Sequence, residues 1–137
     1  DGQGLLMLRK GGIVPIVITG RDSAAVRRRV SDLGLAHAAF GASDKVAAAE
    51  AILQPLGIAW GDVAVIGDDW PDLPLFDRAG FACAPANAHA EARGAAAYVT
   101  EHSGGRGAAR EFCDLLLMAN GLYAPLMDKL LVTLDSK

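Results

Sequence analysis

Two adjacent carboxylates, Asp68 and Asp69, directly follow a short apolar run, and Asp72 comes three residues later. Neighbouring carboxylates at the end of a buried strand repel each other unless a positive charge lies near them. Mg²⁺ commonly supplies that charge, held by one or two carboxylates, waters and a substrate phosphate. The pattern therefore predicts a magnesium site with Asp68 and Asp69 as ligands. The alternative is that Asp69 caps a helix beginning at Trp70-Pro71 and that Asp72 complements the helix dipole.

A second polar group, Thr19-Gly20-Arg21, follows another apolar run that is rich in β-branched residues. The Thr19 hydroxyl and adjacent N–H groups could hold a phosphate oxygen, and Arg21 could bind an anion with two hydrogen bonds. A capping threonine and a solvated arginine are the alternatives. Lys45 stands at a predicted helix start, where the helix dipole disfavours a cation. Its position predicts a functional lysine, unless Lys45 only pairs with Asp44.

A glycine-rich turn, Gly104-Gly105-Arg106-Gly107, precedes the last strongly amphipathic segment. The glycines permit close approach of an anion, and Arg106 could bind a carboxylate or a phosphate. A glycine turn without a ligand is the alternative. His37, His89 and His102 do not have the spacing of metal ligands, and of the three only His102 lies beside this turn.

The composition indicates one folded domain. The 137 residues are 52% hydrophobic and 21% charged, with a net charge of −3. These values argue against a disordered chain and against a nucleic-acid binder that relies on bulk positive charge, and they leave a local basic patch as an open alternative. No run approaches the roughly 20 apolar residues of a membrane span. The two cysteines, Cys83 and Cys113, fit no zinc or redox motif and are expected to be buried, reduced thiols of a cytoplasmic protein.

The elements that must position these residues alternate between strand and helix. Apolar runs predict strands at 14–18, 38–40, 63–66, 81–84 and 98–100. Helical patterns occur before Gly11-Gly12 and at 23–34, 45–56, 71–79, 88–93 and 106–120. This alternation predicts a parallel sheet with helices on both faces, in which functional residues lie at the carboxyl ends of strands. Residues 19–21 and 67–69 occupy two such ends.

In chain order these motifs resemble those of the haloacid dehalogenase superfamily of phosphohydrolases. A threonine follows one strand, a lysine begins a helix, and Gly-Asp-Asp-x-x-Asp follows a later strand. A receiver domain has its acidic pair before the threonine, which argues against that class. Segments 1–5, 18–21, 67–72 and 104–111 further resemble the 3-deoxy-D-manno-octulosonate 8-phosphate phosphatase family. The resemblance extends from residue 1 to about 121 and implies a Rossmann-like, three-layer α/β/α core over 1–121.

The resemblance also implies an activity. Family members are Mg²⁺-dependent phosphomonoesterases that act on a small phosphorylated sugar acid in lipopolysaccharide precursor synthesis, through an aspartyl-phosphate intermediate. By this resemblance Thr19 would bind the phosphoryl oxygens, and Lys45 would neutralise the charge of the transferring group. Gly20 and Arg21 would help to bind the substrate beside them.

The remaining roles follow from the same resemblance. Asp68 would ligate Mg²⁺, Asp69 would support it directly or through water, and Asp72 would act behind them. Arg106 would bind the carboxylate of the sugar acid, from a neighbouring subunit. Family members form homotetramers, and neither nucleic acid nor a membrane is expected as a partner.

The family's first motif, Asp-x-Asp-Gly-x-x-Thr, does not occur in the printed sequence. It supplies the nucleophilic and the acid–base aspartate, so residues 1–137 alone are expected not to run the reaction. Its strand would stand between 14–18 and 63–66. We therefore predict that these two strands form no ladder and lie roughly 9–10 Å apart. The alternative is that the remaining strands have closed up and pair directly. The alternative function is a non-catalytic assembly or regulatory module, as in modules fused to sialic-acid cytidylyltransferases.

Residues 122–137 form a tail beyond the predicted domain. Apolar residues recur in it at helix-like intervals: Leu122, Leu126, Met127, Leu130, Leu131 and Leu134. A small domain has little core left to receive them, which predicts an oligomer contact. Packing on the chain's own domain is the alternative.

Overall fold

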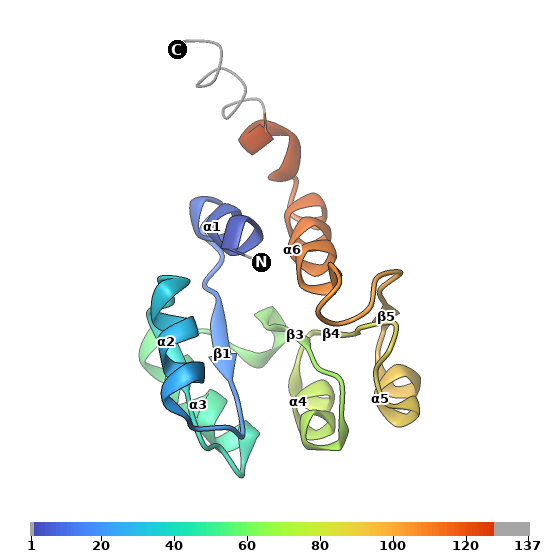
Figure 1. Ribbon diagram of the computed structural model, residues 1–137. Coiled ribbons are helices and arrows are strands. Elements are labelled where there is room, and N and C mark those ends of the chain that lie inside the picture. The colour runs from blue at the N-terminus through green and yellow to red at the C-terminus, as the bar shows by residue number, and fades with distance from the viewer. Residues whose placement is uncertain (1, 128–137) are drawn as a thin grey trace.

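Strands and helices alternate along residues 2–127, the part of the chain that the computed structural model describes (Figure 1). The elements are α1 (Gly2–Lys10), β1 (Ile16–Ile18), α2 (Ala24–Asp32), β2 (His37–Ala39), α3 (Lys45–Leu56), β3 (Ala64–Ile66), α4 (Leu73–Arg78), β4 (Phe81–Ala84), α5 (Ala90–Ala95), β5 (Tyr98–Val99) and α6 (Ala108–Ala119). Each corresponds to a predicted element. The sequence pattern did not indicate the 3₁₀ turn η1 (Trp60–Asp62), whereas η2 (Trp70–Asp72) begins the helix expected at Pro71.

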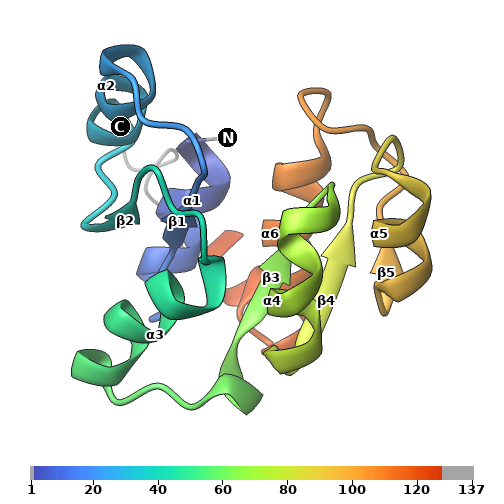
Figure 2. The same ribbon diagram turned by 90° about the horizontal axis from the view of Figure 1, so that it is seen from below.

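The strands form two parallel sheets, β1-β2 and β3-β4-β5. In register, Ile16 lies opposite His37, and Ala64 lies opposite Phe81. As predicted, no ladder joins β1 to β3 within residues 2–127. The sheets stand next to each other with these two strands on the facing edges (Figure 2). Every residue of β1 and β3 is only half-buried, whereas three of the four residues of β4 are buried. The expected spacing of 9–10 Å stays a prediction.

Helices α3 and α4 connect the two sheets on one face. Ala49 and Leu53 of α3 form a buried apolar cluster with Leu75 of α4. Ile16 of β1 and Val65 of β3 pack against this cluster. Burial of apolar side chains therefore holds the two sheets together where backbone hydrogen bonds do not.

Helices α1 and α6 lie together on the opposite face (Figure 1). Met7 and Leu8 of α1 form a second buried cluster with Cys113 and Leu117 of α6. Gly4 permits their close approach, because a Cβ atom at this position would lie 3.1 Å from the Cβ of Cys113. Both cysteines are buried and free, as expected. Within the described part of the chain, every helix is too short or too polar to cross a bilayer.

The first part of the tail packs on the chain's own domain. Residues 123–127 are helical, and Leu122, Leu126 and Met127 contact the α1–α6 cluster. These three apolar side chains thus have a partner within the chain, which is the alternative that the sequence left open. Leu130, Leu131 and Leu134 lie outside the described residues, and the oligomer contact of 122–137 stays a prediction.

Candidate active site

A pocket of about 460 Å³ lies where the carboxyl ends of β1 and β3 meet. Seven of the eight residues predicted from the sequence line it. These seven are Thr19, Gly20, Arg21, Lys45, Asp68, Asp69 and Asp72. Four further residues complete the lining: Gly41, Ala42, Ser43 and Pro71. The eighth, Arg106, does not line it. The loop 41–43 was missed, although it follows the predicted strand at 38–40 and so lies at a third carboxyl end.

Asp72 is the most constrained carboxylate of this pocket. Its residue is 8% exposed, and its Oδ1 atom lies 2.6 Å from Nζ of Lys45. Its Oδ2 atom accepts hydrogen bonds from the backbone N–H of Asp68, at 3.0 Å, and of Asp69, at 3.3 Å. Asp72 thereby shapes the loop that carries the two predicted metal ligands, which is consistent with its predicted place behind them. Asp72 does more than complement the helix dipole.

Gly67 makes room for this arrangement. A Cβ atom at position 67 would lie 2.5 Å from the Cβ and 2.7 Å from the Cγ of Asp72. Both distances are far inside van der Waals contact, so a side chain at 67 would displace the Asp72 carboxylate. The glycine after β3 is therefore required by close packing.

Lys45 pairs with Asp72 and not with Asp44. Asp44 instead caps α3, because its Oδ1 accepts the backbone N–H of Ala47 at 3.0 Å. The alternative interpretation of Lys45 as a surface residue paired with its neighbour is therefore wrong. The side chains of Lys45 and Asp72 are only 15% and 11% exposed, so their attraction is less screened by solvent than that of a surface pair.

Asp68 and Asp69 differ in what their carboxylates do. Asp69 Oδ1 accepts the backbone N–H of Trp70 at 2.7 Å, and Asp69 forms a capping box with Asp72. The interpretation of Asp69 as a helix cap is thus correct, and the cap occupies Oδ1 of its carboxylate. The Asp68 carboxylate has no hydrogen-bond or ion-pair partner among residues 2–127, while its backbone carbonyl accepts the N–H of His89 at 2.9 Å. The backbone of Asp68 is therefore held in place, while its carboxylate stays free to bind a ligand in the pocket.

These acidic residues do not make a complete metal cage. No cluster of three or more His, Cys, Asp or Glu with metal-binding geometry occurs within the described ranges. Mg²⁺ needs fewer protein ligands, since it keeps several waters and uses one or two carboxylates with substrate phosphate. Asp68, with Asp69 beside it, fits that donor set. A phosphate brought next to both carboxylates would be repelled unless a cation lay between them.

Thr19 is held at the end of β1 by the backbone. Its N–H donates to the Ala39 carbonyl at 3.0 Å, and its carbonyl accepts the N–H of Ala42 at 2.9 Å. Its Oγ1 accepts the N–H of Arg21 at 3.1 Å. The Thr19 O–H consequently remains available to donate to a ligand in the pocket. The alternative of a capping threonine is wrong, because Ser23 is the N-cap of α2 and its side chain accepts the Val26 N–H.

Arg106 lies on the loop between β5 and α6, away from the pocket lining. Its guanidinium has no partner within the described part of the chain. Its expected role in binding a carboxylate from a neighbouring subunit stays a prediction.

The fold and the pocket define a class of protein. Residues 41–112, more than half of the chain, match the family model of the haloacid dehalogenase-like hydrolases. The chain belongs to this family. The matched region contains Lys45 and the whole Asp68–Asp72 loop.

Relatives narrow the comparison. The chain is 42% identical over 121 residues to the 3-deoxy-D-manno-octulosonate 8-phosphate phosphatase of Salmonella typhi. That alignment covers 88% of this chain and 64% of the relative, so the chain spans just under two thirds of the curated relatives it matches.

Solved structures of phosphatases are also similar to this chain. A probable phosphatase from Pseudomonas syringae has a TM-score of 0.91 and 41% identity, over 96% of this chain and 74% of that one. The Moraxella catarrhalis 3-deoxy-D-manno-octulosonate 8-phosphate phosphatase, solved with a magnesium ion, a phosphate ion and KDO, has a TM-score of 0.89 and 39% identity, over 95% and 75%.

Proposed function

We propose that this chain forms most of a Mg²⁺-dependent phosphatase that releases phosphate from 3-deoxy-D-manno-octulosonate 8-phosphate. One observation carries the proposal: Lys45, held by Asp72, and the free carboxylate of Asp68 line one pocket at the carboxyl ends of both sheets. The named relatives support the substrate, since the Salmonella protein is 42% and the Moraxella protein 39% identical to this chain over the aligned residues. Their names also favour an enzyme over the non-catalytic module.

Asp68 would hold the metal, with Asp69 contributing its second oxygen directly or through water. The bound Mg²⁺ would supply positive charge where the phosphate meets the two carboxylates. Lys45 has three N–H donors and uses one on Asp72, so two remain for phosphoryl oxygens. The Thr19 O–H and the Gly20 N–H would bind the oxygens on the other side.

The nucleophile would come from the Asp-x-Asp motif, which is not among residues 1–137. The unpaired facing edges of β1 and β3 would receive the strand that bears it. With that strand parallel to β1 and β3, its carboxyl end would enter the pocket. One aspartate would attack phosphorus, and the departing sugar oxygen would take a proton from the other. Water would then hydrolyse the acyl phosphate.

Assembly and location belong to the same proposal. A homotetramer would bring Arg106 of one subunit to the pocket of another, where it would bind the carboxylate of the sugar acid. The two buried free thiols favour a reducing compartment, the cytoplasm. There the product would enter lipopolysaccharide precursor synthesis.

The test adds a strand with the Asp-x-Asp-Gly-x-x-Thr motif ahead of residue 1. Phosphate release from 3-deoxy-D-manno-octulosonate 8-phosphate is then measured with and without Mg²⁺, beside a panel of other sugar phosphates. Asp68→Asn should abolish the Mg²⁺-dependent rate. Asp62→Asn is the matched control, because Asp62 is exposed and outside the pocket.

Each possible result of this assay tests a different part of the proposal. Absence of release from every sugar phosphate would overturn the phosphatase. Release from other sugar phosphates but not from this one would overturn only the substrate. A rate that survives Asp68→Asn would overturn the assigned metal ligand.

A further inference from the structure

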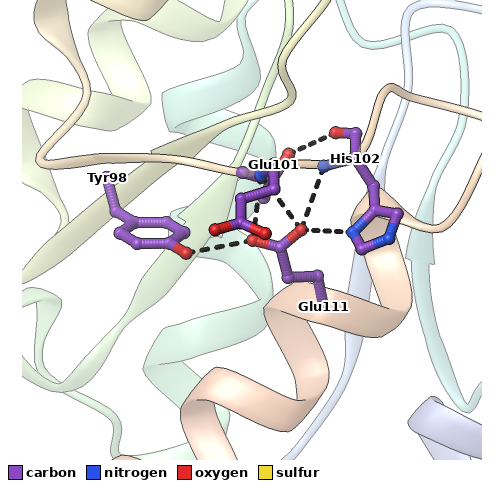
Figure 3. Close-up of polar contacts among 5 residues, drawn as sticks. Tyr98, Glu101, His102 and Glu111 are labelled. Carbon is purple, nitrogen blue, oxygen red and sulfur yellow. Dashed lines mark hydrogen bonds and ion pairs between the residues drawn. The ribbon is translucent and has the colours of Figure 1, made fainter.

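The carboxylate of Glu111, in the first turn of α6, accepts hydrogen bonds from three residues that precede the helix (Figure 3). The Tyr98 hydroxyl donates to Oε2 at 3.0 Å. The backbone N–H of Glu101 lies 3.0 and 3.1 Å from the two oxygens, and the N–H of His102 lies 3.1 Å from Oε1. The His102 ring adds a contact, with Nδ1 at 2.7 Å from Oε1. One side chain of α6 thus fixes the end of β5 and the start of the next loop.

The ionised form of Glu111 is strongly favoured. Burial raises its pKa, but the hydrogen bonds from the His102 ring, the two backbone N–H groups and the Tyr98 hydroxyl outweigh burial and lower the pKa to about 2. The titratable groups that face Glu111 are His102 and Glu101 of the loop, Tyr98 of β5 and Cys83 of β4. The carboxylate therefore keeps its full capacity to accept hydrogen bonds at neutral pH.

Other contacts fix the same loop, residues 101–107. The His102 carbonyl accepts the Ala86 N–H at 3.2 Å and the Thr100 hydroxyl at 2.5 Å. The Gly104 N–H donates to Asn87 Oδ1 at 2.7 Å. These contacts tie the first half of the loop to neighbouring parts of the domain.

The second half of the loop carries Arg106. Gly105 and Gly107 on either side have φ values of +77° and +108°, which favour glycine over other residues. The Arg106 N–H donates to the Ser103 carbonyl at 3.0 Å, while its guanidinium has no partner among the described residues. A loop with this many contacts thus presents an unpaired cation, although an exposed loop would ordinarily be mobile.

We propose that Glu111 is a positioning residue: it holds loop 101–107 so that Arg106 is presented to an anionic ligand of the carboxylate or phosphate class. The choice of ligand rests on the function proposed above, whereas the effect of Glu111 on the loop does not. Glu111 acts across the β5–α6 connection, because its carboxylate binds residues 98–102 rather than its own helix. Its loss should loosen the loop more than the body of the domain.

The experiment measures amide hydrogen exchange by NMR on the chain as it is. Glu111→Gln replaces an acceptor oxygen with an N–H₂ group that faces the same donors. The amides of Glu101, His102 and Arg106 should exchange at least about tenfold faster. The matched control is Glu101→Gln, the same change in the same loop at an exposed side chain, and exchange there should change by less than about twofold.

Amides of the second half of α6, residues 114–119, report on the whole domain. If Glu111 served only general stability, exchange in α6 and in the loop would accelerate by the same factor, which would overturn the proposal. Unchanged loop exchange in Glu111→Gln would also overturn it. Tyr98→Phe is the second variant should Glu111→Gln fail to fold. It removes one donor, keeps the carboxylate, and should accelerate loop exchange selectively.

A spectroscopic readout follows Arg106 itself. The Nε–H signal of Arg106 should show increased fast motion in Glu111→Gln and remain as in the unmodified chain in Glu101→Gln. None of these measurements needs catalysis, so failure of the phosphatase assay would leave this proposal standing. An Arg106 signal that does not respond to Glu111→Gln would overturn the positioning role even if the phosphatase assay succeeded.

Discussion

The ammonium group of Lys45 lies 2.6 Å from the Oδ1 atom of Asp72, and this ion pair joins the two halves of the domain. Lys45 begins α3, which packs against the β1–β2 sheet, whereas Asp72 follows β3 of the other sheet. The same carboxylate binds the N–H groups of Asp68 and Asp69. A single contact therefore aligns the lysine that we propose binds phosphate with the loop that we propose binds the metal.

Lys45→Met should destabilise the chain by about 1–3 kcal/mol, because it leaves a buried carboxylate without its cationic partner. In the enzyme completed with the Asp-x-Asp strand, the same change should lower kcat by about 100-fold or more, since a charge aimed at the phosphoryl group is lost. Urea unfolding and phosphate release measure the two effects. Arg78→Met is the control, because its pair with Glu50 is exposed and should contribute less than about 1 kcal/mol. Equal effects of the two changes would contradict the assigned role of Lys45.

Gly67→Ala should displace the Asp72 carboxylate and cost about 1–3 kcal/mol, because the new Cβ would overlap Asp72. Gly94→Ala is the control, and it should change the free energy of unfolding in the opposite direction. Gly94 lies within α5 with no atom within 4 Å of an added Cβ, and alanine should stabilise the helix there by about 0.5–1 kcal/mol. Urea midpoints of the two variants measure the difference. A Gly67→Ala protein as stable as the unmodified chain would contradict the packing argument.

The sequence predicted the residues of the pocket better than it predicted their contacts. Thr19 and Asp68 could be found because polar residues directly after apolar strands converge at one edge of a parallel sheet. Lys45 was found because it begins a helix against the dipole. Its partner could not be found, since Asp72 is 27 residues away and meets it only through the packing of α3 on α4.

The hydrogen bonds of Glu111 were missed for the same reason. Glu111 has the ordinary appearance of an acidic residue in the first turn of a helix, which the dipole alone explains. Its contacts with Tyr98 and His102 depend on how the loop 101–107 folds back on α6. The unpaired edges of β1 and β3, by contrast, were predicted from the family resemblance, because the motif that would fill the position between them is not in the sequence.

Neither thiol should react with a disulfide reagent in the native state. Cys83 is fully buried, and burial raises its pKa to about 11. Burial also raises the pKa of Cys113, which lies between α1 and α6. Both should react quickly in guanidinium chloride, because the thiolate forms freely once exposed. The thiol that the disulfide reagent releases at pH 8 measures the reaction. Rapid reaction of Cys113 in the native state would show that α1 separates from α6.

Stability that depends on Glu111 should disappear in acid. The pKa of Glu111 is lowered from 4.5 to about 2 in the folded chain, so the unfolded chain binds its proton first as the pH falls. The contribution is therefore fully present above pH 4.5 and is lost as the pH falls from there towards 2.

Urea midpoints of the unmodified chain and of Glu111→Gln, measured between pH 6 and pH 3, test this. The unmodified chain should be the more stable at pH 6, and the gap should narrow below about pH 4.5. Other carboxylates titrate equally in both proteins and cancel in the difference. Glu101→Gln, in the same loop, should show no such narrowing. A gap that stays constant down to pH 3 would mean that the Glu111 carboxylate is not held by these hydrogen bonds.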